Sequence, residues 1–463
     1  GCWCLFNTNK LMPNLKIYTG NRLELLIEKM AQIISTPLSS PFFEDVIVIQ
    51  SIGMQRWISL ELARLLGISA NIRFMFPNML TKELFRCFGL NTMDESPFEV
   101  RYMTWRLMGL IPSLLSHEEF RDIRNYLEDG DERRFFQLCR EIAVILDGYT
   151  IYRPDMLLKW QKREEYHWQA LLWNRLVKDV DSSHFAELKK EFIKRCSRRD
   201  APNELPERIC VFGISALPPF YIEVLQSVSK LVDVHMFLMN PCKEYWSDIR
   251  SDEEIERIIG EGRYSLSELH LEKGNSLLSS MGRYSRTFFS FITDIDEVES
   301  EEIFYSPEGR DMLSIIQSDI LNLFDRPGSS EKFMLSKEDR SIEVHSCRSP
   351  IREIEVLYDN LLSMFEEDPE LMPKDIIVMT PDINSYAPFI EAIFGAADGG
   401  VNIPYSIADL PFSKKSSICD TFISLLELDK KRFSASSVLS IMESPPLMRA
   451  FDLDTTDIEM IQR

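Results

Sequence analysis

The sequence predicts an α/β fold built on parallel sheets, because short apolar strands alternate along the chain with longer amphipathic segments. Three β-branched runs carry this prediction, at residues 45–50, 208–213 and 233–239. Each precedes a turn, and the intervening chain is long enough for the crossover helices that parallel strands need. With 463 residues, of which 45% are hydrophobic, the chain can bury sizeable cores, and we expect roughly two to four domains.

The start of the chain divides into an extension and a first β-α unit. Residues 1–11, GCWCLFNTNKL, do not fit the α/β pattern of the residues after them, and we expect Met12 to be the natural start. Alternation over 15–18 predicts a strand. Asn21, with Glu24 three residues later, predicts the cap of a helix.

The segment 45–65, DVIVIQSIGMQRWISLELARL, predicts a buried strand, a turn at Gly53 and a helix. A nucleotide-binding domain places its phosphate loop at such a turn, and that loop needs a lysine and a Ser or Thr after its glycines. QSIGMQRW has no Gly-Lys-Ser/Thr. The strand at 208–213 ends in glycine and serine, where an ATPase has acidic residues for magnesium. The position of a phosphate loop is therefore predicted without its chemistry.

Helical periodicity dominates from residue 80 to about 180, most clearly at 98–110 and 133–149. Trp160, Trp168 and Trp173 suit either the core or base stacking, and core is the favoured interpretation. A basic run follows, for which a solvated helix face is favoured over phosphate contacts. Its members are Lys189, Lys190, Lys194, Arg195, Arg198 and Arg199.

The second half starts with an acidic segment, 251–308, that we interpret as a surface insertion with helical pieces. The stretch 325–331, DRPGSSE, is the best linker candidate. A new α/β unit is predicted after it, with strands at 342–346 and 375–380 and a helix at 350–365. The last residues keep a helix-like pattern, so we expect the chain to be the N-terminal part of something longer.

Composition limits the class of protein. The formal net charge of −21 gives no global basic footprint, so nucleic acid would need a local groove or a more basic partner. Nine cysteines lack a CxxC pair apart from Cys2 and Cys4 in the extension, and six histidines are dispersed, which indicates neither zinc nor a catalytic dyad. No nuclease-like carboxylate-lysine constellation and no run of eighteen apolar residues occurs. We expect a cytoplasmic protein outside the membrane.

Eight stretches in the same order resemble the N-terminal half of the RecC family, the gamma subunits of exodeoxyribonuclease V. They cover nearly the whole chain from Leu15 onwards and read VIQSIGMQRW, GISANIRF, YTIYRPDML, VFGISALPPFY, NPCKEYWSDI, IQSDIL, EEDPELMPKDIIVM and DINSYAPFI. Eight ordered matches are far more specific than any single short motif.

The resemblance implies two helicase-like modules of superfamily 1 type that have lost ATP hydrolysis. The first would span 12–325, with a helical subdomain inserted at about 80–200, and 326–463 would begin a truncated second module. The chain would be a non-catalytic subunit of an ATP-dependent helicase-nuclease for double-strand break repair. RecB-like and RecD-like partners would supply motors and nuclease and use ATP and Mg²⁺, with no cofactor in this chain. The chain itself would split the duplex, guide the 3′ single strand and scan for a Chi hotspot.

The family's hotspot-reading positions carry over only in part. Gln50, Asp147 and Arg153 match them, whereas other positions depart: Ile52, Arg56, Phe76, Lys82, Val144 and Phe185. We expect DNA contacts at Gln50, Ser51, Arg56, Lys82, Asp147 and Arg153, and a hotspot that is different or absent, because each good base contact gives about 1 to 3 kcal/mol of discrimination.

Structural alternatives stay open at these positions. Gln50 could satisfy the turn backbone, Arg153 could pair with Asp155 or Asp147, and Asp147 more plausibly orients an arginine than touches DNA. Two other functions also stay open for the chain: an active helicase-like ATPase with an atypical loop, and an acidic interaction scaffold.

Overall fold

The computed structural model describes residues 15–90, 96–178, 180, 183–198, 202, 204–260, 274–295, 298–326, 333–395, 402–410, 416–428 and 433–462. The chain divides into two compact units, Gly1–Ser341 and Ile342–Arg463. This division lies sixteen residues after the predicted module boundary at 325. The predicted extension 1–11 and most of the predicted linker, 327–331, lie outside the described residues.

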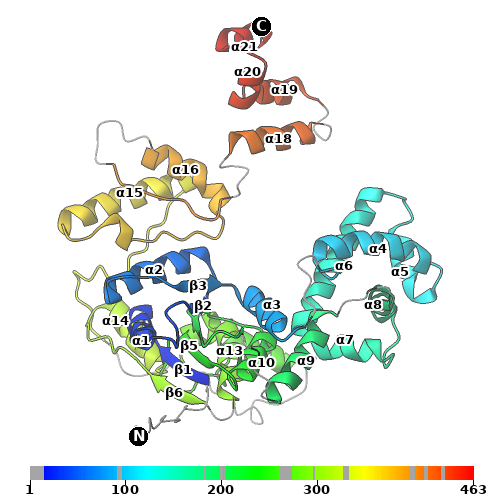
Figure 1. The fold of residues 1–463 in the computed structure, drawn as a ribbon. Coiled ribbons are helices and arrows are strands. Elements are labelled where there is room, and N and C mark those ends of the chain that lie inside the picture. Colours follow the sequence, from blue (N-terminus) through cyan, green and yellow to red (C-terminus); the bar gives the residue numbers. More distant parts are fainter. Residues whose placement is uncertain are drawn as a thin grey trace. The chain divides into compact units, whose positions relative to one another are not determined.

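The first unit is built on a six-stranded sheet in which every pairing is parallel, as predicted (Figure 1). The strand order is β3-β2-β4-β5-β1-β6. The strands are β1 (Leu15–Gly20), β2 (Asp45–Val48), β3 (Ile72–Met75), β4 (Arg208–Phe212), β5 (Asp233–Met239) and β6 (Glu299–Glu302). Strands β2 and β4 are buried along their whole length, which explains why every residue after the first, Asp45 or Arg208, is apolar.

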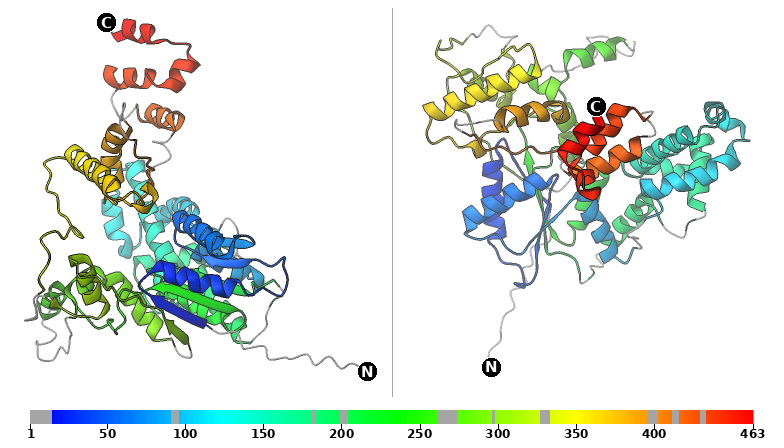
Figure 2. Two further views of the ribbon diagram at one scale, coloured as in Figure 1. Left: turned by 90° about the vertical axis from the view of Figure 1, so that its left-hand side faces the viewer. Right: turned by 90° about the horizontal axis from the view of Figure 1, so that it is seen from above.

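Helices cover both faces of this sheet (Figures 1 and 2). On one face, Ile47 packs with α1 (Leu23–Ile34) and α2 (Ile52–Leu66). On the other face, Val46 and Val48 share a core with five helices. These are α3 (Pro77–Cys87), α9 (Phe185–Ser197), α10 (Pro219–Val228), α12 (Ser276–Met281) and α13 (Arg283–Thr293).

A helical subdomain with its own core is inserted between α3 and α9. It consists of α4 (Val100–Leu114), α5 (Arg121–Tyr126), α6 (Glu132–Tyr152), α7 (Pro154–Gln161) and α8 (Trp168–Lys178). Trp160 and Trp173 are fully buried in that core, and Trp168 packs against it. The core interpretation of these tryptophans is therefore confirmed.

The segment expected to be a surface insertion is partly structural. It contains α11 (Asp252–Gly260), α12 (Ser276–Met281), α13 and β6, followed by α14 (Met312–Leu321). Strand β6 reads ESEE and is fully exposed, but it completes the sheet beside β1, where Lys16 and Lys29 pair with Glu299 and Glu301 at 2.8 and 2.7 Å. Its charged sequence is typical of a protected sheet edge rather than of a loop.

The predicted Asn21 cap is wrong. Helix α1 begins after Arg22 without a side-chain cap. The Asn21 amide instead donates to the Tyr305 carbonyl at 2.7 Å and accepts from the Tyr305 N–H at 2.8 Å. The cap signal fails because this paired contact, 284 residues away along the chain, uses both polar ends of the same amide.

The described residues of the second unit form helices joined by irregular segments. Its helices are α15 (Pro350–Glu367), α16 (Ile383–Gly395), α18 (Ser417–Glu427), α19 (Ala435–Met442), α20 (Pro445–Ala450) and α21 (Thr455–Gln462). The helix predicted at 350–365 is confirmed, but no strand forms at 342–346 or 375–380, both of which the structure describes. Apolar alternation defines a strand only when a neighbour completes the ladder, and here Val344 and Val378 are exposed.

Candidate nucleic-acid interface

The turn between β2 and α2, together with the start of α2, carries three of the six predicted site residues. Gln50 and Ser51 are exposed in the turn, and Arg56 is exposed on α2. Ser51 is the cap of α2, and its hydroxyl accepts a hydrogen bond from the Met54 N–H at 3.2 Å. One of the free N–H groups that a phosphate loop would offer is thus already paired.

The end of the neighbouring strand closes against this turn. Gly213 follows β4 with a φ of +64°, a conformation that suits glycine. A Cβ added there would come within 3.2 Å of the Met54 methyl carbon. The side chain of Met54 therefore lies between the β2–α2 turn and the end of β4. It puts an apolar group at the place where an ATPase has its acidic residues.

Lys82 and Asp147 are brought into one cluster by three helices. The Lys82 ammonium on α3 lies 3.0 Å from the carboxylate of Glu99, the residue that precedes α4. Asp147 lies on α6, where burial and the Glu99 charge raise the pKa of its carboxyl, while Lys82 lowers it. Within the described residues Asp147 forms no ion pair with an arginine, and Lys82 is the cation whose charge acts on its carboxyl.

Tyr221, at the start of α10, also belongs to this cluster, because Asp147 and Tyr152 interact with it electrostatically. Burial raises the pKa of Tyr221 to about 12, with smaller contributions from Asp147 and Tyr152. Sequence reasoning missed Glu99, Tyr152 and Tyr221. No local pattern marks them, because they come from separate elements that meet only in the fold.

Arg153 stands at the junction of α6 and α7. Its N–H donates to Tyr149 O at 3.0 Å, its carbonyl accepts from the Met156 N–H at 3.1 Å, and Pro154 starts α7. The guanidinium is exposed and forms no ion pair with Asp147 or Asp155 in the described structure. The chain thus fixes the backbone of Arg153 and leaves its charge available.

Some residues of the predicted basic run are paired within the fold, and others are exposed to solvent. Lys189 is buried and pairs with Glu223 at 2.8 Å, and Arg195 donates to Glu191 at 3.0 Å and to the Phe88 carbonyl at 2.5 Å. Lys190, Lys194 and Arg198 are exposed, whereas Arg199 lies outside the described residues. Part of the run therefore secures α9 and only the rest is solvated.

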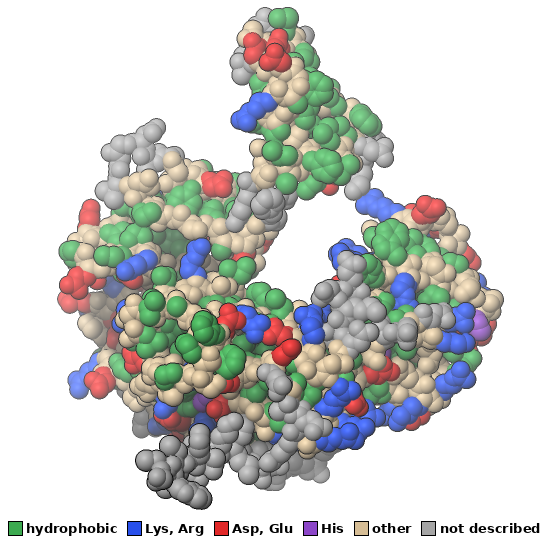
Figure 3. Space-filling model, viewed as in Figure 1, with side chains coloured by type: hydrophobic (Ala, Val, Ile, Leu, Met, Phe, Trp, Pro, Cys, Tyr) green, Lys and Arg blue, Asp and Glu red, His purple; other side chains and the backbone are tan. Residues whose placement is uncertain are grey.

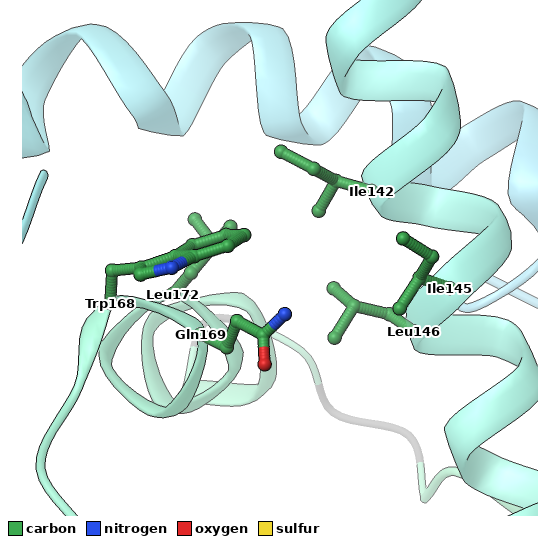
Figure 4. Close-up of a pocket in the computed structure, with 6 residues that line it drawn as sticks. All are labelled: Ile142, Ile145, Leu146, Trp168, Gln169 and Leu172. Carbon is green, nitrogen blue, oxygen red and sulfur yellow. The ribbon is translucent and has the colours of Figure 1, made fainter. Parts of the chain in front are cut away.

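A small apolar cavity in the helical subdomain is a packing gap (Figure 4). Its space of about 10 Å³ admits one water at most. It is lined by Ile142, Ile145, Leu146, Trp168, Gln169 and Leu172. Trp168 thus completes a core instead of offering a base-sized site.

Metal and membrane signals are both absent from the part of the chain that the structure describes. Among those residues, no three His, Cys, Asp or Glu side chains gather closely enough to hold a metal ion. No helix within the same ranges is both long and apolar enough to cross a bilayer.

Comparison of the sequence with known proteins identifies the family of the chain. A family model described as "RecC, N-terminal domain" matches residues 15–323, and one described as "RecBCD enzyme subunit RecC fourth domain" matches 415–463. Proteins named RecBCD enzyme subunit RecC are similar over almost the whole chain. The one from Haemophilus influenzae is 34% identical over 96% of this chain, that from Escherichia coli 35% over 97%, and that from Mycolicibacterium smegmatis 30% over 96%. The chain spans 42 to 45% of the length of these relatives.

Proposed function

The chain belongs to the RecC family, and from this membership we propose that it is a DNA-handling subunit of an exodeoxyribonuclease V-type helicase-nuclease. Its partners are RecB-like and RecD-like subunits, which supply the motors and the nuclease and use ATP and Mg²⁺. The chain itself has no catalytic site and no cofactor. It splits the duplex end and guides the 3′ single strand, and the complex works in the cytoplasm in recombinational repair of double-strand breaks.

The structure of the β2–α2 turn supports the absence of ATP hydrolysis in this proposal. Ser51 pairs one N–H at the start of α2 and the Met54 side chain lies against Gly213, an arrangement that favours a closed turn over a cradle for a triphosphate. An active helicase-like ATPase needs the opposite arrangement.

ATP turnover separates these two functions. We expect Ser51→Ala and Arg56→Ala to leave ATP hydrolysis by the DNA-stimulated complex within about twofold of the wild type, because neither residue serves a nucleotide. The measurement is steady-state phosphate release with saturating DNA, with variants in the partner's own phosphate loop as the positive control. A loss of a hundredfold in the Ser51 variant would favour the ATPase function.

The two cations of the interface, half-buried Lys82 and exposed Arg153, provide the test of DNA handling. We expect Lys82→Ala and Arg153→Ala to weaken binding of a forked duplex with a 3′ tail by the assembled complex, by about 1 to 3 kcal/mol for a base contact. A phosphate contact would instead lower the salt slope by about 0.7 per lost cation. Arg175→Ala is the matched control, because Arg175 is exposed on α8. If Lys82→Ala and Arg153→Ala bind like the wild type, as the control does, the interaction-scaffold function is favoured.

We also propose that the hotspot differs from that of familiar family members. Ile52, Phe76 and Val144 offer no hydrogen-bonding group at positions where the family reads sequence. We expect the assembled enzyme to pass the usual Chi octamer without changing its activity, as followed by the lengths of the products from a Chi-containing duplex. Strong pausing at that octamer would contradict this.

A further inference from the structure

Trp105 is the only exposed tryptophan among the described residues, with 65% of its surface accessible. It lies on α4, and its ring packs against Phe136 on α6 at a centroid distance of 5.5 Å and an angle of 50°. Neither ring belongs to the buried core of the helical subdomain. Trp105 therefore presents a large ring to solvent, with Phe136 packed against it.

Two arginines accompany these rings. Arg133 and Arg140 are exposed on α6, and neither guanidinium forms an ion pair or hydrogen bond in the described structure. Arg134, between them, is different because it pairs with Asp129 at 2.6 Å. In a chain with a net charge of −21, two unpaired arginines beside the exposed Tyr126 and the half-buried Phe136 are a local basic site.

The surface is hollowed at this point. A shallow depression of about 550 Å³ is lined by Tyr126, Arg133, Phe136, Gln137, Leu138, Arg140 and Glu141. Figure 3 shows Lys and Arg side chains gathered over the helical subdomain at the right of the view. We call the set formed by Trp105, Tyr126, Arg133, Phe136 and Arg140 the α4–α6 face.

The α4–α6 face lies on the same side of α6 as Asp147, but packed helix surface separates the two, because Ala143 between them is fully buried. At about 100° per residue, Phe136, Arg140 and Asp147 point within about 40° of each other, and Arg133 lies on the same side. Arg133 and Asp147 are fourteen residues apart, which is about 21 Å along the helix. The exposed part of this side, from Arg133 to Arg140, is about 10 Å long, which at about 3.4 Å per phosphate is the length of about three nucleotides.

We infer that the α4–α6 face binds a single-stranded nucleic acid, with bases stacked on Trp105, Phe136 and Tyr126 and phosphates held by Arg133 and Arg140. Base stacking on aromatic rings next to arginine is sequence-tolerant, as a guiding surface requires. The inference rests on the proposed function and extends it, because it assigns a contact beyond the base-reading positions. Unpaired arginines favour an anionic ligand over the apolar surface of another protein.

Affinity for a single strand tests this contact. The variants are Trp105→Ala, Trp105→Phe and Arg140→Gln in the intact protein with its partner subunits, and the probe is a fluorescent 3′-tailed fork. We expect Trp105→Ala to weaken binding about tenfold and Trp105→Phe to recover most of this loss. Arg140→Gln is expected to lower the salt slope by about 0.7. Tyr166→Ala and Arg175→Gln are the matched controls, since both side chains are exposed elsewhere in the subdomain.

The outcomes distinguish this inference from the proposed function. If Trp105→Ala binds within twofold of the wild type while Arg153→Ala is weakened, the α4–α6 face is not a strand contact and the guiding function stands. If neither variant is weakened, the guiding function itself fails. If Trp105→Ala impairs assembly with the RecB-like subunit but keeps strand affinity, the face is a protein interface and the inference is overturned.

Discussion

Replacing Arg208 by methionine is expected to lower the free energy of unfolding of the first unit by about 3 to 5 kcal/mol. Arg208 lies on β4 and holds Asp45 of β2 with two charge-assisted hydrogen bonds of 2.6 and 3.1 Å. It also donates to the carbonyls of Ile33 and Thr36 at 2.8 and 3.1 Å. Only 7% of Arg208 and 8% of Asp45 are accessible. Removing the guanidinium leaves a buried carboxylate without its charged partner and takes one donor from each of the two carbonyls, of which Ile33 O keeps the Thr36 N–H at 3.2 Å.

Chemical unfolding followed by circular dichroism measures this effect. Arg64→Met is the matched control, because Arg64 pairs with Glu61 on the exposed side of α2, where an ion pair contributes about 0 to 1 kcal/mol. The double variant Arg208→Met, Asp45→Leu is expected to recover much of the loss, since it leaves no unpaired charge. Equal unfolding midpoints for Arg208→Met and Arg64→Met would show that the buried pair does not stabilise the sheet.

Acidification from pH 6.5 to 4 is expected to cost the first unit about 3 kcal/mol through His184 alone. Burial lowers the pKa of His184 to about 4, and the neighbouring Glu187 only partly opposes this. The ring packs edge-on against Phe98 and Trp173, at centroid distances of 5.7 and 5.0 Å. Its two nitrogens have no hydrogen-bond partner within the described residues. The folded state therefore favours the neutral ring.

The direction of the pH effect follows from the two pKa values. The unfolded chain protonates His184 near pH 6.5, whereas the folded chain does so only near pH 4. The stabilisation is therefore complete above pH 6.5 and is lost as the pH falls towards 4. His235, whose pKa burial also lowers to about 4, adds a loss in the same window.

The variant His184→Phe isolates this contribution. We expect its free energy of unfolding to fall less between pH 6.5 and 4 than that of the wild type, because phenylalanine does not titrate. His117→Leu is the control, since His117 is exposed before α5. If His184→Phe and the wild type lose stability in parallel, the ring is protonated in the folded state.

Sequence patterns identified the strands that have two buried faces. Runs such as 208–212 contain only apolar residues after the first, because neighbours cover both sides of each strand. The edge strand Glu299–Glu302 has no apolar residue and gives no strand signal at all. In the second unit the opposite error occurred, since apolar segments near Val344 and Val378 have no neighbouring strand among the described residues. Local patterns report what a residue can bury and not which partner is present.

The candidate interface was predicted to a similar extent. Family resemblance identified Lys82 and Asp147, and the fold brings them together. Glu99 was missed because its contact with Lys82 depends on how α4 begins beside α3. Trp105 lies in the segment 98–110, whose spacing predicted a helix, and its ring is exposed. Periodicity identifies a helix, but only packing decides which of its aromatic residues face the solvent.

Strand-specific cross-linking of the assembled complex tests the central claim most directly. A forked duplex with photoreactive nucleotides placed separately in the 3′ and the 5′ strand would be bound to the complex, and the attachment sites on this chain mapped by mass spectrometry. We predict attachment from the 3′ strand at the β2–α2 turn around Arg56 and at the α6–α7 junction around Arg153. Attachment of both strands to the partner subunits alone would contradict the account and identify the chain as a scaffold.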